Sequence, residues 1–229
     1  MKIAVLGSAA GGGFPQWNSN AEGCRRARAG DPAARPRTQA SLAVSADGVV
    51  WFLINASPDL REQIGRSAYL HPRDGLRSSP IAGVVLTGGD VDVIAGLLTL
   101  RERQPLTLYA TSRIHDVLKA NPIFEVLARD VVRREVVTLD AAVMLDDGLT
   151  VELFAVPGKT PLYLEGADAP AIETSETTVA AAISDGATTV FYIPGCAARR
   201  WCSSTAPCGA TTRWSSPGSA PRPAGGWAT

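Results

Sequence analysis

Residues 6–18 read Leu-Gly-Ser-Ala-Ala-Gly-Gly-Gly-Phe-Pro-Gln-Trp-Asn, directly behind the short apolar run 2–6. Glycine accepts positive φ and lets another backbone or a ligand come close, so such a run after a predicted strand indicates a shaped binding loop. A dinucleotide-binding fingerprint needs G-x-G-x-x-G at the start of a helix, whereas here Pro15 follows the glycines and no amphipathic helix comes next. The stretch therefore predicts a buried strand that leads into a functional loop, and not a nucleotide site.

Composition excludes several classes of function. The chain has 229 residues, 45% of them hydrophobic, with 22 basic and 22 acidic side chains. A chain of this size can bury a core, and its balanced charge gives no bulk field that would attract nucleic acid. No apolar run approaches the roughly 20 residues that span a bilayer, and the N-terminus lacks a signal-peptide core. We therefore expect a cytoplasmic globular protein with no nucleic-acid partner and no membrane segment.

Strands and helices follow one another through the middle of the chain. Two apolar runs at 41–45 and 49–55 flank Ala-Asp-Gly and predict a β-hairpin. Ser57 is expected to cap a helix over 58–65, Ser112 a helix that runs to 120, and residues 157–161 are expected to form a rigid turn. The other expected strands are 2–6, 81–86, 106–110, 136–139, 143–145, 149–156, 178–184 and 188–193, and the other expected helices are 93–103 and a short one ending near 127.

The acidic turn between residues 88 and 93 is a second candidate for chemistry. Asp90 and Asp92 stand where a predicted strand gives way to a helix, so they can share a divalent cation, or one of them can act as a general base. The alternative is that Asp92 only caps the helix while Asp90 is solvated. Cys24 stands alone, without metal-ligand spacing. Trp17 is suited either to stack on a ligand or to cover the core.

The end of the chain differs from the rest. Residues 197–229 contain no Val, Leu, Ile, Met, Phe or Tyr, so no amphipathic helix or strand can be written there, and we expect disorder. A natural linker rich in proline and serine is one explanation, and an out-of-frame reading of the gene is another. The expected organisation is therefore a domain over 1–196 and an aberrant tail over 197–229.

Several blocks resemble the family of pyrroloquinoline quinone (PQQ) biosynthesis protein B, which has a metallo-β-lactamase-like fold. The blocks are 5–18, 37–45, 54–60, 79–81, 90–92, 95–98 with 100–102, 121–124, 156–159 and 192–196. The resemblance covers about residues 1–196 and implies an α+β fold, an αββα sandwich that is truncated at its C-terminus. It implies a role in PQQ biosynthesis, in which the chain acts on PQQ or its precursor or helps to transport it to the periplasm. Two alternatives stay open, a metal-dependent oxidase or hydroxylase of a tyrosine-derived precursor, and an inactive family member.

The resemblance also implies a divalent metal, iron or zinc, but its ligand set is depleted here. The family's C-x-C-x-x-C falls on Ser19, Ala21 and Cys24, and the histidine of its Asp-Val-Asp-His turn falls on Val93. Valine cannot coordinate a metal, and one thiol is too few for a closed zinc site. The candidate metal ligands are therefore Asp90, Asp92 and Cys24, and a chain without metal is the alternative. Whether the chain is an enzyme stays open.

The remaining site and partner expectations follow from the same resemblance. Asp90 and Asp92 are the candidate catalytic residues, and the candidate ligand-binding residues are Gly11, Gly12, Gly13, Gln16 and Trp17. The implied partners are PQQ or its precursor, other PQQ biosynthesis proteins and a second copy of the chain. We also expect marginal stability, because the loss of later parts of a sandwich leaves sheet edges and apolar faces uncovered.

Overall fold

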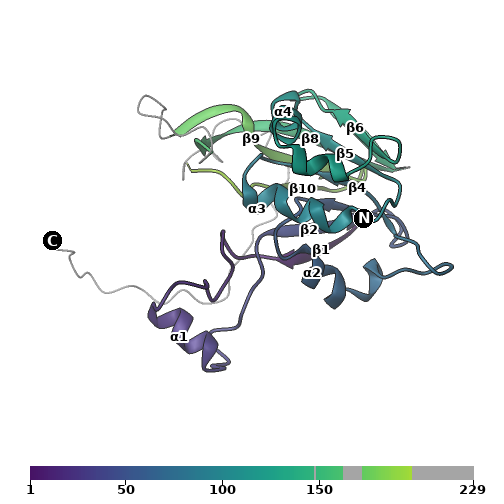
Figure 1. The fold of residues 1–229 in the computed structure, drawn as a ribbon. Coiled ribbons are helices and arrows are strands. Elements are labelled where there is room, and N and C mark those ends of the chain that lie inside the picture. The colour runs from purple at the N-terminus through teal and green to yellow at the C-terminus, as the bar shows by residue number, and fades with distance from the viewer. Residues whose placement is uncertain (147, 162–171, 198–229) are drawn as a thin grey trace. The chain divides into compact units, whose positions relative to one another are not determined.

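The computed structural model describes residues 1–146, 148–161 and 172–197, all within the unit Met1–Arg199 (Figure 1). The disorder expected over 197–229 thus concerns, apart from Ala197, residues outside the described ones. The strands are β1 Lys2–Gly7, β2 Ser41–Ser45, β3 Trp51–Ile54, β4 Ile81–Val85, β5 Leu106–Ala110, β6 Val132–Val136, β7 Ala142–Asp146, β8 Leu149–Lys159, β9 Ile172–Ser184 and β10 Thr189–Tyr192. The helices are α1 Glu22–Arg28, α2 Leu60–Arg66, α3 Val91–Ile94 and α4 Ser112–Ala120, with 3-10 turns η1 Ala68–Leu70, η2 Ala95–Leu100 and η3 Pro122–Val126.

The first sheet mixes two kinds of pairing. Its strands lie in the order β1-β2-β3-β4-β5-β6, antiparallel from β1 to β3 and parallel from β3 to β6. The predicted hairpin is therefore confirmed as β2 and β3. Parallel strands need crossover connections, and these carry α2, α3 and α4. The carboxyl ends of β3, β4 and β5 consequently meet at one edge of the sheet, where open α/β sheets bind their ligands.

The second sheet packs on the same core as the first. Its strands run β10-β9-β8-β7, all antiparallel, with the long pair β8 and β9 at its centre. One buried cluster includes Leu53 and Leu108 from the first sheet and Leu153 and Ile183 from the second, each fully excluded from solvent. Helix α4 packs against β5 and β6. The two sheets thus form the central layers of the α+β sandwich that the resemblance implies.

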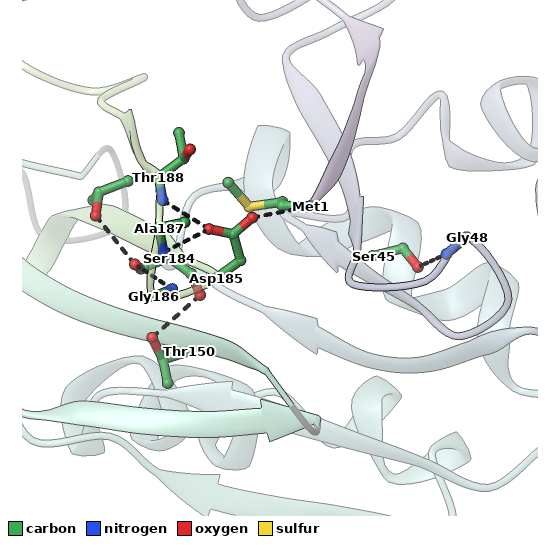
Figure 2. A network of polar contacts seen from close by, with 10 residues as sticks. Met1, Ser45, Gly48, Thr150, Ser184, Asp185, Gly186, Ala187 and Thr188 are labelled. Carbon is green, nitrogen blue, oxygen red and sulfur yellow. Dashed lines mark hydrogen bonds and ion pairs between the residues drawn. The ribbon is translucent and has the colours of Figure 1, made fainter.

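An ion pair joins the start of the chain to the second sheet (Figure 2). The α-ammonium of Met1 lies 2.8 Å from Oδ2 of Asp185, in the turn between β9 and β10. The other carboxylate oxygen accepts hydrogen bonds from the backbone N–H groups of Ala187 and Thr188 at 3.0 and 2.7 Å. The Met1 ammonium, followed by these two N–H groups, lowers the pKa of Asp185 to about 2. This clasp holds one end of β1 against the sheet to which β1 does not belong.

Three expectations about local structure are wrong at the level of single elements. Strand β1 is not buried: among the described strands it pairs with β2 alone, so it forms an edge of the first sheet, and Val5 is 59% exposed. The hydroxyl of Ser57 does not cap α2 but donates to Oε1 of Gln63 at 3.3 Å. The cap of α4 is Thr111, whose hydroxyl accepts from the N–H of Ile114, so the cap lies one residue before the expected Ser112.

Tertiary pairing accounts for three other differences. The expected turn at 157–161 is strand as far as Lys159, because Pro157 sits at a register shift where β8 continues along β9. The strand expected at 136–139 lies at Val132–Val136, where parallel pairing with β5 fixes its register. The helix expected over 93–103 is α3 followed by η2, since Gly96 donates its N–H to the carbonyl of Ala56 and the backbone tightens there.

Candidate functional site at the carboxyl edge of the first sheet

The acidic turn is held in place by the segment that follows β3. The N–H of Ala56 donates to the carbonyl of Val93 at 2.8 Å, and the N–H of Gly96 donates back to the carbonyl of Ala56 at 2.8 Å. A Cβ added at Gly96 would lie 2.1 Å from the backbone carbonyl oxygen of Ser57, so only glycine allows the two segments to approach this closely. Asp90 precedes α3 and Asp92 lies inside it, and neither side chain caps the helix. The expectation that Asp92 only serves as a cap is therefore wrong.

A buried polar pair locks the ends of β3 and β4 together. Asn55 is 1% exposed and has a φ of 68°, a conformation that non-glycine residues rarely adopt. Its amide oxygen accepts from the N–H of Thr87 at 2.9 Å, and its amide nitrogen donates to the Thr87 hydroxyl at 2.9 Å. Such strain persists where the surrounding structure holds it, often at functional sites. Here it fixes the point from which the acidic turn leaves the sheet.

The glycine loop lies directly against the acidic turn. A Cβ added at Gly11 would be 2.2 Å from Oδ2 of Asp92, which is far inside van der Waals contact. At Gly12, where φ is +83°, an added Cβ would meet the side chain of Gln16 at 3.0 Å. The structure thus brings Gly11 together with Asp92, and Gly12 together with Gln16. The absence of side chains at these positions is what allows the loop to close onto the turn.

Two residues that sequence reasoning missed complete this cluster. Oδ2 of Asp59 accepts from the backbone N–H and the side-chain amide of Gln39 at 2.8 and 3.2 Å. The N–H of Gly12 donates to the side-chain oxygen Oε1 of Gln39 at 3.2 Å. Burial, and then the charge of Asp59, raise the pKa of Asp92. The sequence signal for both residues is that they fall inside the resembling blocks 37–45 and 54–60.

Trp17 and Cys24 belong to a different part of the loop. Trp17 is 83% exposed, so it does not cover the core as one of its two expected roles required. Cys24 is 7% exposed and lies on α1. The Ser19 hydroxyl, and then the backbone of Gln16, lower the pKa of the Cys24 thiol against the opposing effect of burial. The interactions of Cys24 thus lie within the segment around α1, with Ser19 and Gln16.

The donor set does not fit the implied metal. Within residues 1–146, 148–161 and 172–197, no three His, Cys, Asp or Glu side chains gather closely enough to hold an ion. The positions of the family's three cysteines carry a hydroxyl at Ser19, a methyl at Ala21 and one thiol at Cys24, whereas a structural zinc site takes four nitrogen or sulfur ligands. Asp90 and Asp92 alone supply too few ligands for an iron or zinc centre.

Another hollow of the described surface carries no comparable chemistry. A cavity of about 320 Å³ is lined by residues 129–134 at β6. Its charges are paired: Arg129 contacts Glu125 at 2.8 Å, Arg103 contacts Asp130 at 2.6 Å, and Arg133 contacts Glu135. The cluster of glycines and carboxylates at the carboxyl edge of the first sheet is therefore the stronger candidate site.

Comparison with known proteins agrees with this architecture. Residues 50–205 match the model of the beta-lactamase superfamily domain. The chain belongs to the beta-lactamase superfamily. Coenzyme PQQ synthesis protein B of Gluconacetobacter diazotrophicus is 61% identical over 202 residues, and that of Ruegeria pomeroyi is 55% identical over 197 residues. The resemblance found in the sequence is therefore confirmed.

A solved relative lets the fold of this superfamily member be compared directly. The structure of Zn²⁺-bound PqqB from Methylobacterium extorquens is 54% identical and superposes with a TM-score of 0.83 over 86% of this chain. The chain spans 66% of the length of that relative and 66% of each of the two PQQ synthesis proteins. No helix among the described residues is long and apolar enough to cross a membrane.

Proposed function

We propose that the chain takes part in the biosynthesis of PQQ by binding PQQ or its precursor at the carboxyl edge of the first sheet. The observation that carries the proposal is the contact of Gly11 with Asp92, which closes the glycine loop onto the acidic turn. The identity of 61% to a PQQ synthesis protein supplies the class of ligand. In this proposal residues 1–196 form the working domain, in the cytoplasm, and 197–229 are an aberrant tail.

The chemistry of the site indicates how such a ligand would be oriented. Carboxylates accept hydrogen bonds, so the face made by Asp59 and Asp92 suits the N–H and O–H groups of a tyrosine-derived precursor. The ligand's own carboxylates need a cation, and the guanidinium of Arg37 stands at the glycine loop, donating to the Ser8 hydroxyl at 3.2 Å. Arginine matches carboxylate geometry, so Arg37 is the residue that we expect to take the acidic end of the ligand.

Complementation tests the proposal. A strain that lacks its intact PQQ synthesis protein B is supplied with this chain, with the Asp92→Ala variant, or with the matched control Gly65→Ala, whose added methyl would meet no atom within 4 Å. We expect PQQ from the unaltered chain and from the control, and at least about tenfold less from Asp92→Ala, because the loss of a central contact to a ligand typically costs about 1.4 kcal/mol or more. No PQQ from the unaltered chain would overturn the proposal in favour of an inactive family member.

Calorimetry separates the two modes in which a binder can serve the pathway. In the first mode the chain hands PQQ or its precursor to other PQQ biosynthesis proteins, for transport to the periplasm. Binding of PQQ is then the same with and without added divalent cation. In the second mode the chain is a metal-dependent oxidase or hydroxylase, and binding needs the cation. The donor set at Asp90 and Asp92 favours the first mode.

A further inference from the structure

Residues 14–37 form a small lobe that leaves the sheet and returns to the same point. The N–H of Phe14 donates to the carbonyl of Arg37 at 2.9 Å, and the N–H of Arg37 donates back to the carbonyl of Phe14 at 2.7 Å. Helix α1 is the lobe's only helix in the described structure, and it buries just Cys24 and Ala27. Segments below about 40 residues rarely build a sufficient core, and they usually depend on a disulfide or a metal.

The residues of the lobe fit neither a disulfide nor a metal site. Cys24 is a free cysteine, and no other cysteine falls between residues 14 and 37. The thiol of Cys24 instead bonds to the Ser19 hydroxyl and to the backbone of Gln16. The Ser19 hydroxyl also accepts from the N–H of Ala21 at 3.3 Å. The three positions that would supply thiolates are therefore close together, but they are joined by hydrogen bonds.

Arginine side chains of α1 donate hydrogen bonds to carbonyl groups of the loop that precedes this helix. Nη1 of Arg28 donates to the carbonyl of Ser19 at 2.7 Å, and its Nη2 donates to the carbonyl of Gln16 at 2.6 Å. Nη1 of Arg25 donates to the carbonyl of Asn20 at 2.6 Å. Because residues three apart share a face of a helix, the two guanidinium groups act on the same loop. Hydrogen bonds from a charged donor are shorter and stronger than neutral ones.

We infer that the hydrogen bonds of Arg28 hold this lobe together, in place of a metal ion. One guanidinium presents several donors in a fixed plane, so Arg28 can hold residues 16 and 19 at once, as a multivalent ion would. By holding the carbonyl of Gln16, Arg28 also fixes the residue whose side chain lies against Gly12. Arg28 is thus a positioning residue for the glycine loop, and the lobe folds without metal.

Hydrogen exchange of the full chain tests this inference without reference to PQQ. Amide exchange of peptides that cover 14–37 is measured with and without a chelator for the unaltered chain, Arg28→Met, Cys24→Ser and Arg35→Met. Arg35 is the matched control, because within the lobe it donates to the carbonyl of Pro32, at 3.3 Å, and not to residues 16–20. We expect Arg28→Met to speed exchange at 16–20 by roughly threefold to tenfold, the range for lost hydrogen bonds of this kind.

The same measurements include the outcomes that would contradict a role of Arg28 in organising the lobe. The chelator, Cys24→Ser and Arg35→Met should each leave exchange of the lobe unchanged. Faster exchange in the unaltered chain when the chelator is added would show that a metal organises the lobe. Faster exchange in Cys24→Ser that the chelator does not reproduce would instead reflect the lost packing and hydrogen bonds of the thiol. Unchanged exchange in Arg28→Met would show that the guanidinium is dispensable. Arg28→Lys should restore only part of the protection, since a single ammonium lacks the planar fork.

Discussion

Single side chains, or their absence, decide whether the candidate site can form. Gly11 has no unusual backbone angle, so its need for glycine comes from the Asp92 carboxylate that occupies the space of a Cβ. Asn55 shows the opposite case, in which a side chain accepts a strained backbone because its amide locks Thr87. Both residues serve the geometry of the acidic turn, which makes the residues around it sensitive to very small substitutions.

The Gly11→Ala substitution should destabilise the chain by about 1–3 kcal/mol, the usual cost of overpacking. The added methyl would meet Asp92 at 2.2 Å, so the loop or the carboxylate must move. Gly65→Ala is the control, because it lies in α2 with nothing within 4 Å and should stabilise by up to about 1 kcal/mol. Urea unfolding measures both. If Gly11→Ala with Asp92→Ala is no more stable than Gly11→Ala alone, the clash is not with Asp92.

Replacing Asp92 by Asn should raise the urea midpoint at pH 7. Burial, and then the charge of Asp59, raise the pKa of Asp92, so the ionised carboxylate weakens the folded state at neutral pH and Asn lacks this penalty. The gain should shrink as the pH falls and Asp92 takes up its proton. Asp74→Asn, in the loop between η1 and β4, is the control and should change nothing. A lower midpoint for Asp92→Asn at pH 7 would show that the carboxylate is stabilising.

At the scale of elements, the exposed edge of β1 is the weak point of the fold. An unpaired strand edge with apolar side chains is a template for pairing with another chain. In the described part of the chain, strand β1 has a paired strand on one side, and Ile3 and Val5 are 37% and 59% exposed. The chain therefore carries an association hazard at its first element.

The Val5→Lys substitution should reduce this association. A charged side chain on an edge strand opposes edge-to-edge pairing, so light scattering of a concentrated solution should fall severalfold relative to the unaltered chain. Val49→Lys provides the comparison, because Val49 is 55% exposed but lies in the hairpin turn between β2 and β3. Equal scattering of Val5→Lys and the unaltered chain would place the contact elsewhere.

The elements also show what could be read from the sequence. Apolar runs bounded by turn residues predicted β2, β4 and β5 closely, because local patterning and turn chemistry specify such strands. The bounds of β6 and the extension of β8 through Pro157 depend on pairing with distant strands, which no local pattern contains. In the site, Asp90, Asp92 and the glycines stood out by composition. Gln39 and Asp59 did not, because their role arises only when three loops meet.

At the scale of the whole molecule, two sheets share one core but are also joined at the chain's first residue. Leu53 and Leu153 belong to the same buried cluster, so loosening one sheet exposes the other. The ion pair between the Met1 ammonium and Asp185 adds a polar link at the margin of that core. Its strength depends on the charge of one carboxylate, so it responds to acid.

The Asp185→Asn substitution should lower the urea midpoint at pH 7, and the difference from the unaltered chain should vanish in acid. The folded-state pKa of Asp185 is about 2 against an ordinary 3.8, so its contribution is complete above pH 3.8 and is lost as the pH falls toward 2. Asn keeps the Oδ1 acceptor for the N–H groups of Ala187 and Thr188, so the variant isolates the ion pair. A difference that persists unchanged at pH 2 would assign the loss to the turn.

The clasp at Met1 has a practical consequence for handling the protein. Any residue placed before Met1, such as an affinity tag, converts the α-ammonium that meets Asp185 into a neutral amide and adds bulk where the Met1 side of the pair is only 4% exposed. Acetylation of the amino terminus would do the same. An affinity tag at the N-terminus therefore removes an ion pair of the folded protein. The stability of tagged protein should be compared with that of tag-free protein before it is taken as the stability of the chain.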